Sequence, residues 1–206
     1  RRGEYEGLES KITSSEWFPD YGPAKFKPRM GATASGARQI LIAYNVNLNT
    51  SDKKKANGIA GTIRTSGVIL RDENGSKVMD IDGKPVRKPG MFQSLQAAGW
   101  MYNEDTAQVS MNLLDHNVTG LHTVTEAIRT EAGNIGLKAE AGELVGLVPL
   151  NAMISAGKHY HNEPDNANQA TLVQSAIKGL MLSELEDFDA YNSIIEWAVK
   201  RNLGDI

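Results

Sequence analysis

Amide side chains spaced two residues apart are the first feature of this sequence that could do chemistry. The stretch LIAYNVNLNT, residues 41 to 50, starts as an apolar strand and then places Asn45 and Asn47 on one face of an extended chain. A second stretch, residues 107 to 115, alternates three polar and three apolar side chains: Gln108, Ser110 and Asn112 against Val109, Met111 and Leu113. Amides both donate and accept hydrogen bonds, which suits a neutral heterocyclic edge or a carboxylate.

If these two strands pair, their polar residues form one face of a sheet. Many antiparallel sheets leave one face in water, so a simply solvated face is the alternative interpretation. A solvated face usually carries Lys, Glu and Thr, whereas these positions hold short amides and small residues. The residue types therefore favour the wall of a ligand cleft, and we predict contacts to a ligand from five residues: Asn45, Asn47, Gln108, Ser110 and Asn112.

The four histidines form no recognisable metal or catalytic motif. His159 and His161 lie two residues apart, and His116 and His122 flank the start of a predicted helix, but no carboxylate joins them at helical ligand spacing. The serines lack the Gly-x-Ser-x-Gly turn of a nucleophilic serine. We therefore expect surface or capping histidines and no metal site.

The glycine-containing stretch GATASGAR, residues 31 to 38, only loosely resembles a phosphate-binding loop. It lacks the Gly-Lys-Ser/Thr ending, and it precedes a predicted strand instead of a helix. A close approach of backbone to ligand suits its glycines better, with Arg38 entering the sheet as a further candidate binding residue.

The composition excludes several classes of protein. Lys and Arg number 22 against 25 Asp and Glu, so no global field attracts nucleic acid or an anionic membrane. The absence of cysteine removes disulfides and thiolate sites and fits a reducing, cytoplasmic compartment. The apolar runs are too short to span a bilayer. The chain begins without methionine, in RRGEYEGLESK, a composition typical of the middle of a helix, which suggests a fragment or a processed chain.

Hydrophobic periodicity and turn signals predict an α+β fold. Helical composition at 2–11 precedes an ordered loop at 13–37, whose aromatic residues argue against a flexible linker. The expected strands are 38–48, 94–102, 107–115 and 139–149, the two crossover helices are 50–65 and 119–136, and a hairpin is inserted at 67–90. Helices at about 150–160, 166–181 and 189–201 follow. This βαββαβ order predicts a ferredoxin-like antiparallel sheet with helices on one face, plus a C-terminal helical tail.

RNA-recognition modules share this order of elements. They stack bases on aromatic residues of their central strands in a basic setting. The central strands here carry amides, and the formal net charge is -3, so we expect no nucleic-acid partner.

Several segments together resemble the glutamate formimidoyltransferase family. They are GEYEGLESKI, EWFPDYGPAKFKPRMGATASGARQILIAYNVNLNT, QAAGWMYNEDTAQVSMNLLDHNVTGLHTVTEA and GELVGLVPLNAM. The resemblance implies transfer of a formimino group from N-formimino-glutamate to tetrahydrofolate in histidine degradation, in a cleft between two similar α/β halves. It also implies an N-terminal formiminotransferase subdomain as partner, a homodimer, and a catalytic histidine in the preceding half.

The resemblance assigns this chain to the folate-facing half of that enzyme. The expected parts are residues 1–30 as the end of the N-terminal subdomain with a folate-site loop, 31–160 as the C-terminal subdomain, and 161–206 as the tail. None of the four histidines lies in a motif of the family's base, so we expect no catalytic residue in this chain and no activity from it alone. The alternative function is a non-enzymatic ligand-binding or assembly module that uses the open sheet face.

The resemblance further places the loop KITSSEWFPDYGP, residues 11 to 23, beside the pterin and benzoyl groups of folate. Its side-chain types suit that position, because Trp17 and Phe18 offer flat apolar surfaces and Asp20 can accept hydrogen bonds from N–H groups. Alternatively, the two aromatic residues only anchor the loop. The candidate residues of the loop are Lys11, which could meet the carboxylates of the folate tail, with Trp17, Phe18, Pro19, Asp20 and Gly22.

Overall fold

The computed structural model describes residues 6–204. The chain divides into two compact units, Arg1–Arg38 and Gln39–Ile206, which we describe separately. In the first unit, helix α1 (Leu8–Lys11) is followed by a single 3-10 turn (Ser15–Trp17), and Ile12 is the residue buried there. The predicted helix was longer, and its first four positions, 2–5, lie outside the described residues.

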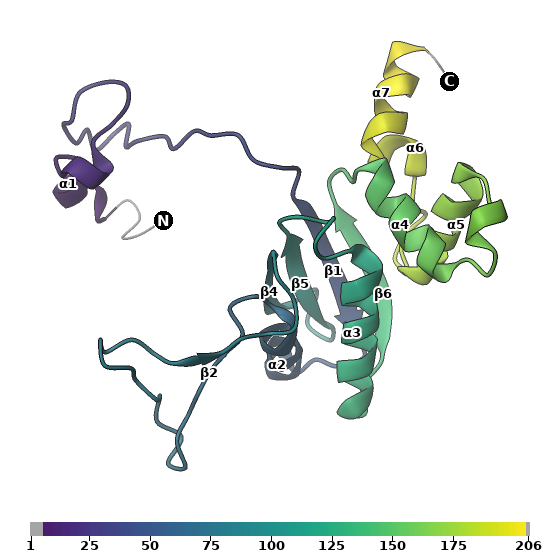
Figure 1. Ribbon diagram of the computed structural model, residues 1–206, viewed down its shortest axis with the longest axis horizontal. Coiled ribbons are helices and arrows are strands. Elements are labelled where there is room, and N and C mark those ends of the chain that lie inside the picture. The colour runs from purple at the N-terminus through teal and green to yellow at the C-terminus, as the bar shows by residue number, and fades with distance from the viewer. Residues whose placement is uncertain (1–5, 205–206) are drawn as a thin grey trace. The chain divides into compact units, whose positions relative to one another are not determined.

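The second unit contains a four-stranded antiparallel sheet (Figure 1). Its strands are β1 (Ile42–Leu48), β4 (Leu95–Met101), β5 (Ala107–Leu113) and β6 (Ala139–Val145), in the spatial order β4-β5-β1-β6. The predicted α+β class and the antiparallel pairing of the first and third of these strands are therefore confirmed.

The first strand is shorter than predicted at its start. It begins at Ile42, and the expectation that Arg38 enters the sheet is wrong: Arg38 is exposed and ends the first unit. The reason lies in the neighbouring strands. The pairing with β5 ends at Ile42 and Leu113, and the pairing with β6 ends at Ala43 and Val145, so residues before Ile42 have no strand beside them.

Two crossover helices bury one face of this sheet. Helix α2 (Lys53–Ile63) starts after Asp52, whose carboxylate accepts a hydrogen bond from the Lys54 backbone N–H at 2.9 Å, as the Ser-Asp sequence predicted. Helix α3 (Leu121–Asn134) follows β5. The apolar faces of both helices share one core with alternate residues of the strands, including Ile42, Tyr44, Val46, Leu48, Val109, Met111 and Leu113.

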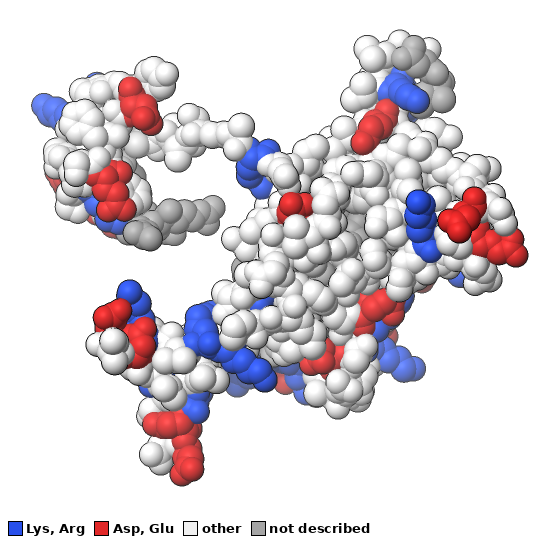
Figure 2. All heavy atoms as spheres, in the orientation of Figure 1, with Lys and Arg blue, Asp and Glu red and all other residues white. Residues whose placement is uncertain are grey.

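The insertion between α2 and β4 is an irregular hairpin. Its ends pair as β2 (Val68–Ile69) and β3 (Arg87–Lys88), and between them lie two similar turns. In each turn an aspartate, Asp72 or Asp80, accepts two backbone N–H bonds. The turns predicted from Asn-Gly and Asp-Gly are therefore confirmed. Figure 2 shows acidic and basic side chains side by side along this hairpin.

A helical tail packs against the edge strand β6. Its helices are α4 (Leu150–Tyr160), α5 (Gln169–Gly179), α6 (Ala190–Ser193) and α7 (Ile195–Leu203), close to the predicted ranges. The backbone N–H of Gly142 on β6 donates to the Met181 carbonyl at 2.9 Å, and Val148 forms a bridge with Ile194. Across residues 6–204, every helix is too short or too polar to cross a membrane.

Candidate functional site

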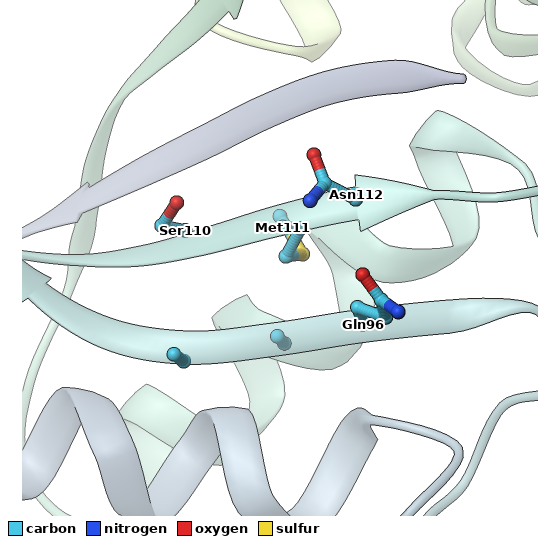
Figure 3. Close-up of a pocket in the computed structure, with 6 residues that line it drawn as sticks. Gln96, Ser110, Met111 and Asn112 are labelled. Carbon is cyan, nitrogen blue, oxygen red and sulfur yellow. The ribbon is translucent and has the colours of Figure 1, made fainter. Parts of the chain in front are cut away.

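The five polar residues predicted from strand alternation lie on one face of the sheet. Asn45 is opposite Ser110, and Asn47 is opposite Gln108, while Asn112 is opposite Ala43. Figure 3 shows Ser110 and Asn112 on one side of β5 and Met111 on the other. The predicted register is confirmed, and we call the side away from α2 and α3 the polar face.

Two hydrogen bonds fix the amides at the centre of the polar face. Gln108 Nε2 donates to Asn47 Oδ1 at 3.0 Å, and Asn45 Nδ2 donates to Glu143 Oε2 on β6 at 2.9 Å. Asn45, Asn47 and Gln108 are only 8%, 3% and 4% exposed. Buried amides are costly unless they are hydrogen-bonded, so these pairs hold the side chains in defined orientations.

Each of these three amides keeps one group free for a ligand. Within residues 6–204, Asn45 Oδ1, Asn47 Nδ2 and Gln108 Oε1 make no hydrogen bond, and none of these atoms is fully buried. They offer two acceptors and one donor. A ligand on the polar face would therefore meet groups that are already oriented and still unpaired.

A shallow depression of about 240 Å³ lies beside these amides, between β4 and β5. Gln96 and Ala98 of β4 line it together with Ser110 and Asn112 of β5 (Figure 3). Farther along β4 the Trp100 ring, 59% exposed, holds the Lys53 ammonium group 4.7 Å from its centroid. The polar face thus carries a hollow with hydrogen-bonding groups and, farther along the same strand, an exposed aromatic ring.

The loop residues predicted to contact folate belong to the first unit. The Lys11 ammonium group lies 4.8 Å from the centroid of the half-buried Trp17 ring, while Phe18 is 63% exposed and Asp20 is also exposed. Pro19 is half-buried, and Gly22 has a φ of 89°, a left-handed conformation that favours glycine. The structure brings the five strand residues together on one face, and in the loop it brings Lys11 to Trp17. The loop and the strand residues belong to different units.

His122, His159 and His161 lie apart from the polar face, on or beside helices α3 and α4. The His122 ring on α3 stacks on the His159 ring on α4 with centroids 4.8 Å apart, and His161 Nδ1 lies 3.0 Å from Ser175 Oγ. His122 differs from the expected surface residue, because its Nδ1 is buried without a partner among the described residues. Burial, with His159 nearby, lowers the pKa of His122 below its usual range. No three potential metal ligands converge anywhere in the part of the chain that the structure describes.

Sequence reasoning missed Glu143, which accepts the hydrogen bond from Asn45. AEAGELV carries no local signal for it, because Glu143 has the same parity as the apolar residues Ala141 and Val145, and only the pairing of β6 with β1 places it opposite Asn45. Residues 139–149 were predicted as a strand from their apolar residues and from Pro149 at the end.

The chain is similar to known proteins along nearly its whole length. A family model described as the formiminotransferase domain matches residues 43–200, and a model of the N-terminal subdomain of that domain matches residues 1–38. A formimidoyltransferase-cyclodeaminase from Dictyostelium discoideum is 40% identical over 206 residues, which cover 98% of this chain and 35% of the relative. The Rattus norvegicus protein of the same name is 40% identical, over 97% of this chain and 34% of its own length.

A shorter relative shows the same likeness. A glutamate formimidoyltransferase from Streptococcus pyogenes serotype M1 is 31% identical over 197 residues, covering 95% of this chain and 51% of the relative. The chain thus spans about a third to a half of the length of these relatives. The polar face lies within the range matched by the first family model, and the match with the N-terminal subdomain ends where the structure divides. This chain belongs to the formiminotransferase family.

Proposed function

We propose that this chain is the folate-facing part of a glutamate formimidoyltransferase, which moves a formimino group from N-formimino-glutamate to tetrahydrofolate in histidine degradation. The observation that carries the proposal is the polar face, where Asn45, Asn47 and Gln108 are fixed by hydrogen bonds and still present unpaired groups. The family relation identifies the chemistry, and the residue types suit the amide and heterocyclic edges of folate. As a finer assignment of the fold, we propose that the sheet and its two crossover helices form a ferredoxin-like arrangement.

Formimino transfer requires an amine nitrogen of the folate to attack the amidine carbon of the donor. A C–N bond forms, the folate nitrogen loses a proton to a base, and the C–N bond to glutamate breaks as its nitrogen regains a proton. Catalysis therefore needs orientation of two substrates, a base, and groups that stabilise charge at the tetrahedral centre. In the proposal, the polar face supplies orientation and hydrogen bonds for these steps.

The base belongs, in the proposal, to a preceding N-terminal subdomain. The described surroundings of His122, His159 and His161 are contacts within and between α3, α4 and α5. These three histidines are therefore structural residues in the proposal, and the 206-residue chain is catalytically incomplete. In the proposal the loop at residues 11–23 also contacts folate, and the enzyme is a cytoplasmic homodimer.

An assay of formimino transfer tests this proposal. The chain alone and the chain joined to its N-terminal subdomain are each supplied with N-formimino-glutamate and tetrahydrofolate, and the modified folate is measured. We expect no turnover from the chain alone and turnover of about 1 to 10³ per second from the joined protein. Asn47→Ala in the joined protein should lower kcat/KM. Enzyme-like turnover by the isolated chain would refute the assignment of the base, and no turnover by the joined protein would refute the function.

An assembly role for the polar face is a second candidate. Trp100 and Val145 lie at the opposite edges of this face and are 59% and 54% exposed. Exposed apolar groups around a polar centre are typical of a surface that meets another protein domain. In this case the isolated chain should associate with itself through the polar face, and Trp100→Glu should return it to a monomer in sedimentation. A chain that is monomeric at every concentration would exclude this role.

A further inference from the structure

A second pocket opens next to the polar face, at residues that none of the preceding arguments uses except Glu143. Its volume is about 360 Å³. Tyr102, which follows the edge strand β4, lines the pocket together with Glu143 on the other edge strand, β6. The remaining wall comes mainly from the tail, between α5 and α6: Leu182, Leu185, Glu186, Asp187, Phe188, Asp189 and Ser193. We call residues 182–189 the tail loop.

The residues just before the tail loop are held firmly against the sheet. The Gly142 N–H donates to the Met181 carbonyl, and the buried Tyr44 hydroxyl donates to the Leu180 carbonyl at 3.1 Å. A Cβ at Gly142 would lie 2.1 Å from the Leu180 oxygen, so only glycine permits this approach. Phe188 packs against the core from within the loop. The pocket wall is therefore a built part of the fold.

The lining of the pocket combines carboxylates with aromatic rings. Among the described residues that line it there are four carboxylates and no Lys, Arg or His. Asp189 accepts hydrogen bonds from Asn192. The carboxylates left to contact a ligand are those of Glu143, Glu186 and Asp187. Tyr102 and Phe188 add flat apolar surface. This chemistry repels anions and suits a planar group that carries N–H donors.

Glu143 is the group best placed to recognise such a ligand. Its Oε2 accepts the hydrogen bond from Asn45 Nδ2, which sets the orientation of the carboxylate. Within residues 6–204, its Oε1 accepts no hydrogen bond. A carboxylate has about four lone-pair sites, so Glu143 can hold the Asn45 amide and still accept two adjacent N–H groups of one planar ligand, as in a bidentate contact.

We propose that the pocket between Tyr102, Glu143 and the tail loop binds a planar group with two adjacent N–H donors, with Glu143 as its main acceptor. This inference rests on the proposed function. Two parts of the substrates have that chemistry: the amidine end of N-formimino-glutamate, and the aminopyrimidinone edge of the pterin. The tail thereby gains a direct role in substrate selection.

The test compares Glu143→Gln with Glu140→Gln in the protein that carries the N-terminal subdomain. The glutamine introduced by Glu143→Gln keeps an oxygen to accept the Asn45 hydrogen bond but cannot accept two N–H groups as a carboxylate does. Glu140 is exposed on the same strand and does not line the pocket, so its replacement removes one charge without altering the site. KM is measured for each substrate in turn, and unfolding midpoints establish that both variants are folded.

We expect Glu143→Gln to raise KM for one substrate about tenfold or more, and Glu140→Gln to leave it within about twofold. A rise for N-formimino-glutamate alone identifies the amidine as the occupant, and a rise for tetrahydrofolate alone identifies the pterin. Unchanged KM values for both substrates, or equal changes in the two variants, overturn the inference. Tyr102→Ala should raise KM for the same substrate.

A wild-type protein without transfer activity would instead refute the proposed function. In that case calorimetry with free pterin and with formamidine tests the pocket separately. Binding of either probe that weakens about tenfold in Glu143→Gln and not in Glu140→Gln supports the pocket assignment. Absence of binding by both probes overturns it.

Discussion

Replacing Tyr44 by Phe should destabilise the protein by separating the tail from the sheet. The Tyr44 side chain is fully buried on β1, and its hydroxyl lies 3.1 Å from both Thr125 Oγ1 on α3 and the Leu180 carbonyl in the tail. One hydroxyl thus joins the central strand, a crossover helix and the segment before the tail loop. Burial raises the pKa of Tyr44 far above its ordinary value, so this group stays neutral and the effect should not depend on pH near neutrality.

The expected loss follows from the single proton of the hydroxyl, which is donated to the Leu180 carbonyl. Thr125 Oγ1 still donates to the Leu121 carbonyl after the change, but the Leu180 carbonyl loses the partner that the hydroxyl gave it. Leaving a buried acceptor without its partner costs about 1 to 3 kcal/mol, so we expect the unfolding free energy to fall by that amount. With a urea m-value of about 2 kcal/mol/M, the midpoint should fall by about 0.5 to 1.5 M.

Urea unfolding followed by circular dichroism measures this change. Tyr102→Phe is the matched control, because it removes the same hydroxyl from a ring that is 44% exposed. The control should keep the wild-type midpoint. If Tyr44→Phe also stays within about 0.3 kcal/mol of wild type, the hydroxyl does not hold the tail to the sheet, and the reasoning is refuted.

Three further changes test other parts of the structure. Gly99→Ala should lower the free energy of unfolding by about 1 to 3 kcal/mol, because the new Cβ would lie 2.3 Å from a backbone nitrogen of α2. Gly58→Ala, in open space on α2, should raise it by about 0.5 to 1 kcal/mol. Thermal unfolding in which Gly99→Ala is as stable as Gly58→Ala would contradict the packing. Because the pKa of His122 is lowered in the folded protein, the unfolded chain binds a proton at this residue more readily. The free energy of unfolding should therefore fall as the pH drops below about 6.5. His122→Gln should flatten this decline, which urea titrations at several pH values measure. In the protein joined to its N-terminal subdomain, Asp20→Ala should weaken tetrahydrofolate binding by about 1.5 to 3 kcal/mol, and unchanged calorimetric affinity in both Asp20→Ala and Trp17→Ala would remove the loop from the site.

The sequence alone predicted the elements whose signals are local. Alternation in β5 placed Gln108 and Ser110 on the polar face, and the Ser-Asp start located the beginning of α2. Each of these signals extends over a few neighbouring residues, since strand parity and helix capping depend on short-range geometry. The helices of the tail were found by the same periodicity.

Contacts between residues that are far apart in the sequence could not be predicted from these local signals. Asn45 and Glu143 are 98 positions apart, and the residues just before the tail loop are bonded to the sheet by Gly142 and Tyr44. The wrong start of the first strand has the same origin, because the apolar pattern continues before Ile42 while the neighbouring strands do not. Partners in space decide these features, and local periodicity carries no information about them.

A crystal structure of the protein with its N-terminal subdomain and a bound folate would test the proposed role of the polar face most directly. We predict that the folate contacts side chains of Asn45, Asn47 or Gln108 at the centre of that face, with Ser110 and Asn112 at its border. A folate bound on the helical side of the sheet, or one that touches none of these five residues, would contradict the assignment of the polar face as the folate site.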